Sequence, residues 1–336
     1  MGMDLKEAYG EVSRRLDRLD FGMLLPGLHR YPFALHTEAE VCLGDRNFPN
    51  EGRFLANTAM EFEGRRMAVW RLSATQQNYD TLAASLVHEM CHAFQVETKT
   101  QFPDLIFGAF YPRNLSNYTA KYVENLLLAG LLYDFDPVKW DDLLSLRARR
   151  LMSMPEAVRY EQLTEGIEGQ AKYVELKALA KLSPGQHSSA LSGLAASLKD
   201  QRTVFDARRS CYDSGAAFLT IAEANGRLLP APASELGTAD AEPLAGGPDL
   251  SAEFQKYFAT IDALVAGALG RADKVEVTGS KLLGFDPYNV RSSGNRLYHP
   301  NFIMCGDSEP QVIMGTFVTV MKEQTRELES VYKVRP

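Results

Sequence analysis

Two histidines and a glutamate in the segment LVHEMCHAFQVE, residues 86–97, are well suited to bind and use a metal ion. His88 and His92 are four residues apart, so in a helix they lie on one face and can bind the same ion from adjacent turns. Glu89 follows His88 directly, where it can reach a metal-bound water without being a ligand itself. We therefore predict a Zn²⁺ ion on His88 and His92, with Glu89 as general base.

A chance match to this short motif is the alternative, because such a spacing also occurs in helices that bind no metal. The surrounding residues favour metal binding, since LAASLV before the motif and Ala93 and Phe94 after it predict a buried helix. Two histidines and a glutamate in a buried helix need a partner to offset lost hydration, and a cation supplies one. Cys91 could add a thiolate ligand, although a buried free cysteine is more often an apolar filler.

A catalytic zinc site needs a third protein ligand and an open position for water. The segment TEGIEGQAKYVELKA, residues 164–178, offers Glu165 and Glu168, which lie three residues apart on one helix face. Glu161 and Glu175 are more distant options, and each fits a solvated helix residue better. From the residues alone, Glu165 and Glu168 both remain candidates for the third ligand.

Residues 168–175, EGQAKYVE, resemble a segment of the gluzincin aminopeptidases, the group that contains aminopeptidase N and leukotriene A4 hydrolase. In that family the third zinc ligand opens an EGxAxYxE-like segment, which implies Glu168 rather than Glu165 here. Residues 211–226, CYDSGAAFLTIAEANG, are similar to the family's YxKGAxxLxxL helix, with Ser214 in place of the usual lysine. The resemblance implies that Tyr212 stabilises the oxyanion of the transition state.

A third match lies before the predicted metal helix, in TAMEFEGRRMAVWRL, residues 58–72, which resembles the family's GxMEN loop and the edge strand after it. It implies that Glu61 binds the free amine of a substrate, although Phe62 replaces the family's asparagine. Arg208 and Arg209 lie one helical turn before Tyr212. They are candidates for binding a substrate carboxylate or a zinc ligand, beside the alternative of solvated surface arginines.

These residues together predict zinc-dependent hydrolysis of peptide bonds. Zinc would lower the pKa of its bound water toward roughly 7. Glu89 would take the proton as the water attacks the peptide carbonyl and then deliver it to the leaving amine. Zinc and the Tyr212 hydroxyl would stabilise the oxyanion. The alternative functions are a degenerate zincin scaffold that binds zinc and a partner without hydrolysis, and a helical binding protein with no metal; the presence of Glu89 favours hydrolysis.

The composition of the 336 residues, 45% apolar and 24% charged, is that of a globular protein. The net charge of −7 argues against a nucleic-acid partner, which prefers a basic face. The most apolar stretch, residues 125–133, is too short to cross a membrane, and the first ten residues lack the apolar core of a signal peptide. Four scattered cysteines without a CxxC pair fit a reduced, cytoplasmic setting. We expect a peptide or protein substrate, and the oligomeric state stays open.

The elements that must position these residues are mainly helices. We expect an amphipathic helix over residues 4–19, a β-hairpin over 54–72 and the metal-binding helix from Asp80, as N-cap, to about Val96. Residues 104–226 are expected to be almost wholly helical. The helices expected there span about 116–133, 137–153, 156–182, 188–204 and 206–225.

The last third of the chain changes in character. Residues 229–250 are rich in proline, glycine and alanine and predict a mobile loop. A helix over 251–269 with Ser251 as N-cap should follow, and alternating and β-branched residues after Ala272 predict strands. We therefore expect an α+β protein: a mainly helical, zincin-like catalytic domain with a small N-terminal β-sheet or hairpin over 1–269, and a small β-rich C-terminal unit over 270–336.

Overall fold

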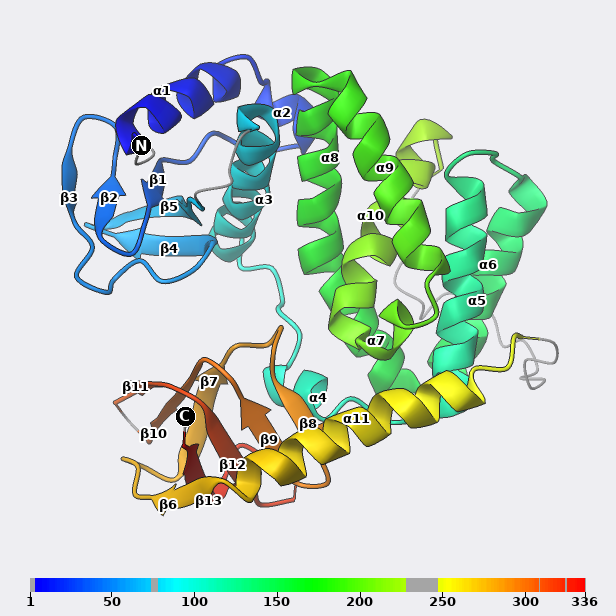
Figure 1. Ribbon diagram of the computed structural model, residues 1–336. Helices are drawn as coiled ribbons and strands as arrows, with labels where there is room; N and C mark the ends of the chain where they lie inside the picture. Colours follow the sequence, from blue (N-terminus) through cyan, green and yellow to red (C-terminus); the bar gives the residue numbers. More distant parts are fainter. Residues whose placement is uncertain (1–3, 74–77, 228–246, 308, 324, 336) are drawn as a thin grey trace.

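A sheet, a helical bundle and a second set of sheets follow one another along the chain in the computed structural model (Figure 1). The structure describes residues 4–73, 78–227, 247–307, 309–323 and 325–335. The expected α+β class is confirmed, with helices concentrated in the middle of the chain and strands at its two ends.

The N-terminal sheet has five strands in the order β3-β2-β1-β5-β4, in which β1 and β5 are parallel and the other neighbours are antiparallel. Its strands are β1 (Phe33–His36), β2 (Glu40–Cys42), β3 (Asn47–Pro49), β4 (Thr58–Phe62) and β5 (Arg65–Arg71). The predicted hairpin is confirmed as β4 and β5, joined by Glu63 and Gly64, which both have positive φ. Strands β1 to β3 were not predicted, because three or four residues are too few to show an alternating pattern.

Helices α1 (Leu5–Leu16), α2 (Phe21–Leu24) and α3 (Tyr79–Glu97) lie beside this sheet, and α3 packs directly on β5. The predicted N-cap of α3 was wrong by two residues. The Asn78 side chain caps the helix by accepting the backbone N–H groups of Asp80 and Thr81, at 2.9 and 3.0 Å. Asp80 accepts a hydrogen bond of 2.6 Å from Arg15 instead, which ties α1 to the start of α3.

The helical bundle follows the expected pattern, with one change that matters for the site. Its helices are α4 (Leu105–Ala109), α5 (Leu115–Leu131), α6 (Pro137–Ser153), α7 (Pro155–Thr164), α8 (Gln170–Leu182), α9 (Pro184–Lys199) and α10 (Ala207–Ala224). The expected helix over 156–182 is continuous but contains a π-helical turn at Glu165–Gly169, between α7 and α8. Helix α9 begins earlier than expected, at Pro184, since proline suits the first turn of a helix.

The β-rich C-terminal part is confirmed and consists of two antiparallel sheets, with strand orders β6-β13-β12-β9-β8 and β11-β10-β7. Its strands are β6 (Ala272–Val275), β7 (Lys281–Phe285), β8 (Arg291–Ser293), β9 (Arg296–His299), β10 (Phe302–Gly306), β11 (Gln311–Met314), β12 (Phe317–Met321) and β13 (Leu328–Val334). Most of the loop expected over 229–250 lies outside the described residues. Ser251 does not cap α11 (Ser251–Leu269); it is the first helical residue and donates its backbone N–H to Asp249, at 2.9 Å.

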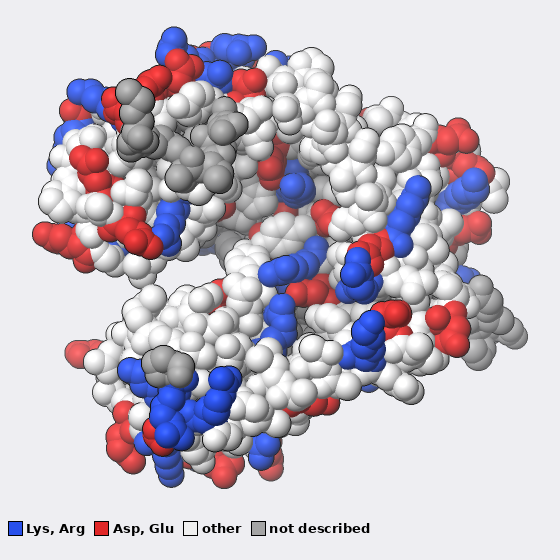
Figure 2. Space-filling view, in the orientation of Figure 1, with Lys and Arg blue, Asp and Glu red and all other residues white. Residues whose placement is uncertain are grey.

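Helix α11 connects the bundle with the C-terminal sheets. Its second half packs Val265 and Ala268 against Val318 of β12, whereas Phe254 and Phe258 near its start join an aromatic cluster of the bundle. Helix α11, which ends at the expected boundary at 269/270, therefore contacts both the bundle and the C-terminal sheets. Figure 2 shows a hollow between the N-terminal sheet and the C-terminal sheets. In the part of the chain that the structure describes, no helix is long and apolar enough to span a bilayer.

Candidate metal centre

Helix α3 and the π-helical turn bring His88, His92 and Glu168 together, although the glutamate is 76 residues from the nearer histidine along the chain. One nitrogen of each imidazole and one carboxylate oxygen lie within 4.8 Å of one another. The two Nε2 atoms are 3.1 Å apart, and His92 Nε2 is 3.2 Å from Glu168 Oε2. Three potential ligand atoms thus point toward one place.

The outer nitrogen of each histidine has a hydrogen-bond partner of its own. His88 Nδ1 lies 3.2 Å from Glu175 Oε2, and His92 Nδ1 lies 2.8 Å from Gln95 Oε1. Because these acceptors favour a proton on Nδ1, the Nε2 lone pairs are left facing the centre. Metal-binding histidines are held in the same way by outer hydrogen-bond acceptors.

The carboxylate of Glu168 uses its two oxygens differently. Oε1 accepts hydrogen bonds from Arg208 and, at 3.3 Å, from the hydroxyl of Tyr288. Oε2 is buried, has no hydrogen-bond donor among the described residues and faces His92. Two acceptor nitrogens and a carboxylate oxygen at such short separations repel one another unless a proton or cation lies among them. The residues present therefore fit a bound divalent metal ion.

The charges around the centre shift the pKa values of its members. Burial raises the pKa of Glu168, but the adjacent imidazole of His92 and the charge of Arg208 outweigh burial and lower it to about 2. Burial also lowers the pKa of His92, but Glu168 and Glu89 beside it raise the pKa overall. Glu168 is thus held ionised, and the carboxyl groups of Glu168 and Glu89 favour a positive charge at His92.

Glu89 is buried beside the two histidines, and no hydrogen bond engages its carboxylate among the described residues. Burial raises the pKa of Glu89, and the nearby imidazoles of His88 and His92 offset this only in part. A carboxylate whose pKa is raised is a stronger base and is better able to take a proton from water. The structure therefore places the predicted base beside the ligands with its oxygens available.

Tyr212, on α10, lies against the centre, with its ring nearly parallel to that of His88 and 6.2 Å from it. Its hydroxyl donates a hydrogen bond of 2.6 Å to the hydroxyl of Tyr288. Tyr288 lies between β7 and β8 and was not predicted at the site, because its segment LLGFDPYNV carries no recognisable motif. The structure thus brings Tyr212 to the centre and adds a second tyrosine from the C-terminal part.

The three residues predicted to bind substrate, Glu61, Arg208 and Arg209, lie in different surroundings. Arg208 is largely buried and pairs with Glu168, so it holds a candidate ligand. Arg209 is 54% exposed and pairs with Asp206, at 3.5 Å, on the outside of the same helix. Glu61 is exposed on the edge strand β4, and the described residues give it no hydrogen bond or ion pair with the centre. Only Arg208 of these three is joined to the centre.

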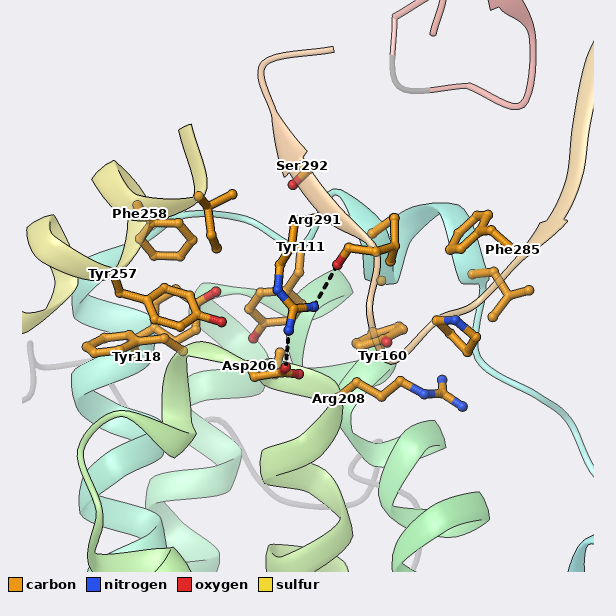
Figure 3. A pocket seen from close by; sticks show the side chains of 18 residues that line it. Tyr111, Tyr118, Tyr160, Asp206, Arg208, Tyr257, Phe258, Phe285, Arg291 and Ser292 are labelled. Atoms are coloured by element: carbon orange, nitrogen blue, oxygen red, sulfur yellow. Dashed lines mark hydrogen bonds and ion pairs between the residues drawn. The ribbon is translucent and has the colours of Figure 1, made fainter. Parts of the chain in front are cut away.

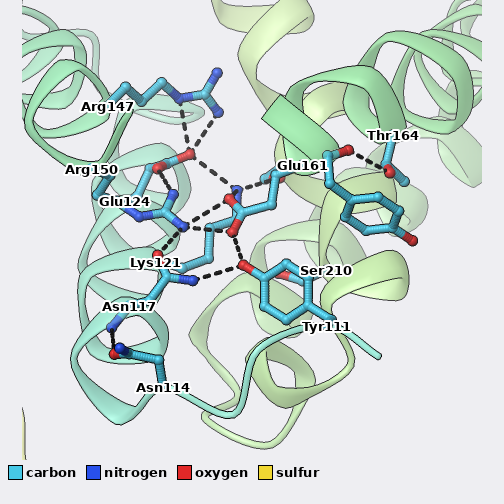
Figure 4. Close-up of polar contacts among 12 residues, drawn as sticks. Tyr111, Asn114, Asn117, Lys121, Glu124, Arg147, Arg150, Glu161, Thr164 and Ser210 are labelled. Carbon is cyan, nitrogen blue, oxygen red and sulfur yellow. Dashed lines mark hydrogen bonds and ion pairs between the residues drawn. The ribbon is translucent and has the colours of Figure 1, made fainter. Parts of the chain in front are cut away.

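Glu165 and Glu161 belong to a separate network of buried charges, of which Figure 4 shows the larger part. Glu165 Oε1 accepts from Lys121 at 2.9 Å and from Arg147 at 3.1 Å, whereas Glu161 pairs with Arg150 at 2.6 Å. These two glutamates neutralise buried cations and do not face the histidines. The expectation that Glu161 and Glu175 are solvated was wrong, because Glu161 is buried here and Glu175 holds His88.

Two further features border the centre. Cys91 is buried on α3, and burial raises the pKa of its thiol to about 12, as expected for an apolar filler. Beyond Arg208 lies a cavity with aromatic walls, in which an ion pair of 3.6 Å joins Asp206 to Arg291 (Figure 3). Pro287, next to Tyr288, also lines this cavity. The turn that carries Tyr288 therefore lies between the cavity and the centre.

Comparison of the chain with family models, with curated proteins and with solved structures gives no match.

Proposed function

We propose that this protein is a zinc-dependent peptidase whose metal ion is held by His88, His92 and Glu168. The observation that carries the proposal is the convergence of two imidazole Nε2 atoms and one carboxylate oxygen, separated by 3.1 and 3.2 Å. Two histidines and a glutamate form a known ligand set of catalytic zinc, with a position left open for water. When bound, zinc supplies a Lewis acid and lowers the pKa of the water it holds.

The residues around the ligands have the chemistry that peptide hydrolysis requires. Glu89 takes a proton from the attacking water and passes it to the leaving amine. The Tyr212 hydroxyl would donate a hydrogen bond to the developing oxyanion; burial raises the pKa of this hydroxyl, so it keeps its proton. Arg208 keeps Glu168 in place through its ion pair. A peptide or protein substrate would enter through the hollow between the N-terminal sheet and the C-terminal sheets (Figure 2).

The alternative is a scaffold that binds zinc and a partner without hydrolysis. Glu89 favours the peptidase, since a structural zinc site has no use for a buried carboxylate that is not a ligand. A cytoplasmic location accords with the four cysteines, all of which are buried and free.

The experiment that tests the proposal compares zinc-loaded wild type with Glu89→Gln on a library of fluorogenic peptides. The variant should keep its zinc and lose about 10²- to 10⁴-fold in rate, as expected when a general base is removed. Glu97→Gln, an exposed position on the same helix, is the matched control and should keep the wild-type rate. An equally active Glu89→Gln variant would refute the mechanism, and a zinc-loaded wild type that cleaves nothing would favour the scaffold.

A further inference from the structure

Tyr288 is held at the metal centre by a turn of the C-terminal part. Asp286 accepts the backbone N–H of Tyr288 at 2.9 Å, and its second oxygen accepts the side-chain amides of Asn289 and Asn301 at 2.8 and 2.6 Å. Arg291 donates to the carbonyl of Tyr288 at 3.1 Å. The turn that carries Tyr288 is therefore held through both the N–H and the carbonyl group of this residue.

The hydroxyl of Tyr288 lies between two groups of the centre. It accepts a hydrogen bond of 2.6 Å from Tyr212 and donates one of 3.3 Å to Glu168 Oε1. The guanidinium of Arg208 lies 5.1 Å from the centre of the Tyr288 ring. Tyr288 is 37% exposed.

These contacts restrict how Glu168 can bind a metal. Arg208 and Tyr288 together occupy Oε1, which leaves Oε2 directed at His92. We infer that Tyr288 is a positioning residue: through it the C-terminal part holds Glu168 as a ligand with one oxygen and keeps the Tyr212 hydroxyl at the centre. The inference rests on the proposed metal site but does not depend on peptide hydrolysis.

A thermodynamic consequence follows from the origin of Tyr288. The C-terminal strands pack around a hydrophobic core that includes Leu282, Leu297 and Phe317 and that Ile106 of α4 joins. Because Tyr288 extends from these strands to a candidate ligand in the bundle, zinc binding and the docking of the C-terminal part should stabilise each other. Zinc should therefore raise the melting temperature of wild type more than that of a variant without the Tyr288 hydroxyl.

The test measures zinc affinity by competition with a chromophoric chelator, with no substrate present. Tyr288→Phe keeps the ring and removes the hydroxyl, and we expect it to bind zinc about tenfold more weakly, the lower end of the effect of an outer partner of a ligand. Tyr298→Phe is the matched control, since Tyr298 is on β9 and packs toward α11, away from the centre. Its zinc affinity should stay within about twofold of wild type, because it touches no ligand.

A second readout separates positioning from general stability. With Co²⁺ in place of zinc, Tyr288→Phe should show a visible absorption spectrum that differs from that of wild type, and Tyr298→Phe should show the wild-type spectrum. The melting temperatures of metal-free wild type, Tyr288→Phe and Tyr298→Phe measure any general loss of stability. If Tyr288→Phe binds zinc as tightly as wild type and its cobalt spectrum is unchanged, the inference about Tyr288 is overturned while the metal site stands. If wild type itself binds no zinc, the metal site fails and the inference fails with it.

Discussion

His88 and His92 present their Nε2 atoms to one point because Glu175 and Gln95 hold the opposite nitrogens. The same division applies to Glu168, whose Oε1 is held by Arg208 while Oε2 faces the histidines. Each inward atom is thus fixed by an outward hydrogen bond. Such outer partners orient metal ligands, and their replacement typically lowers metal affinity about 10- to 100-fold.

Replacement of Tyr212 by phenylalanine tests the oxyanion donor. If the hydroxyl acts only in the transition state, kcat should fall about 10²- to 10³-fold while KM changes little. Steady-state kinetics on the best peptide of the library measures both constants. Tyr122→Phe is the control, because the Tyr122 hydroxyl donates to the carbonyl of Lys199, at 2.8 Å, away from the centre.

The control Tyr122→Phe should change stability and leave the rate unchanged. Loss of its structural hydrogen bond should cost about 1 kcal/mol of unfolding free energy and leave kcat unchanged. If Tyr212→Phe shows this same pattern, Tyr212 has no part in the reaction.

The predictable part of the centre is the part with a local spacing. His88, Glu89 and His92 share one helix, so their spacing alone predicted a common face for the two histidines, with Glu89 beside them. Glu175 and Tyr288 could not be assigned their roles, because each depends on contacts with residues far away in the sequence. Glu168 required the family resemblance, since Glu165 has the same residue type three positions earlier.

At the scale of elements, the π-helical turn and α10 approach each other unusually closely. A Cβ atom added to Gly215 would lie 2.9 Å from the Cα of Gly169 and 3.0 Å from the Cα of Glu165. This contact brings the face of α10 that carries Arg208 and Tyr212 onto Glu168. Such π turns are frequent at functional sites, and this one contains a candidate ligand.

Gly215→Ala should therefore destabilise the protein by about 1–3 kcal/mol, the usual cost of overpacking, and weaken zinc binding because α10 must move away. Gly193→Ala is the matched control: Gly193 is helical, and a Cβ there would meet no atom within 4 Å. The control should gain about 0.5–1 kcal/mol through the higher helix propensity of alanine. Urea denaturation measures the free energy of unfolding of both variants. Equal stability of Gly215→Ala and Gly193→Ala would contradict the close contact between α10 and the π-helical turn.

The helices were predictable from periodicity, while two kinds of detail were not. The π turn between α7 and α8 inserts one extra residue into a helical turn, and a single-residue shift of this kind is hard to distinguish from the ordinary variation of an apolar pattern. The caps at Asn78 and Leu250 differ from the predicted Asp80 and Ser251 by one or two residues. Several polar residues near a helix start can serve as caps, so sequence alone leaves the choice open.

At the scale of the whole molecule, a network of buried charges lies between the helices next to the centre (Figure 4). Burial alone would raise the pKa values of Glu124 and Glu165, but the charges of Arg147 and Lys121 outweigh it and hold both below the ordinary range. Removal of one partner from a buried network leaves an uncompensated charge, so this region is sensitive to substitution.

The network predicts how stability depends on pH. Because both carboxyl groups have lowered pKa values in the folded state, the unfolded chain binds their protons first as the pH falls. The stabilisation should be complete above about pH 5 and should be lost progressively below about pH 4.5, the range in which unfolded glutamates titrate. Urea denaturation of the metal-free protein between pH 7 and pH 3 measures this dependence.

The matched variants are Glu124→Gln and, for an exposed glutamate, Glu51→Gln. Glu124→Gln should be less stable by about 3–5 kcal/mol at pH 7 and should lose less of its stability than wild type on acidification, since one titrating group is gone. Glu51→Gln should follow wild type. An identical pH dependence in all three proteins would exclude Glu124 as a source of acid sensitivity.

The arrangement of the parts was the least predictable feature. The chain's composition and strand patterns predicted a β-rich C-terminal unit, but they carried no information on where it docks. The contact between Tyr212 and Tyr288 joins residues 76 positions apart and depends on the path of α11 between them. Only the folded chain shows that the C-terminal part reaches the proposed metal centre.

Zinc binding by purified protein is the most direct test of the proposed centre. After chelation and dialysis, wild type should take up one zinc ion per chain with high affinity, as should Glu89→Gln and the exposed control Glu223→Gln. Glu168→Gln should bind zinc far more weakly, with its far-UV circular dichroism unchanged, because the ion loses its only carboxylate ligand. One tight zinc in wild type that is lost in Glu168→Gln supports the centre; no tight zinc in wild type, or equal affinity in Glu168→Gln, contradicts it.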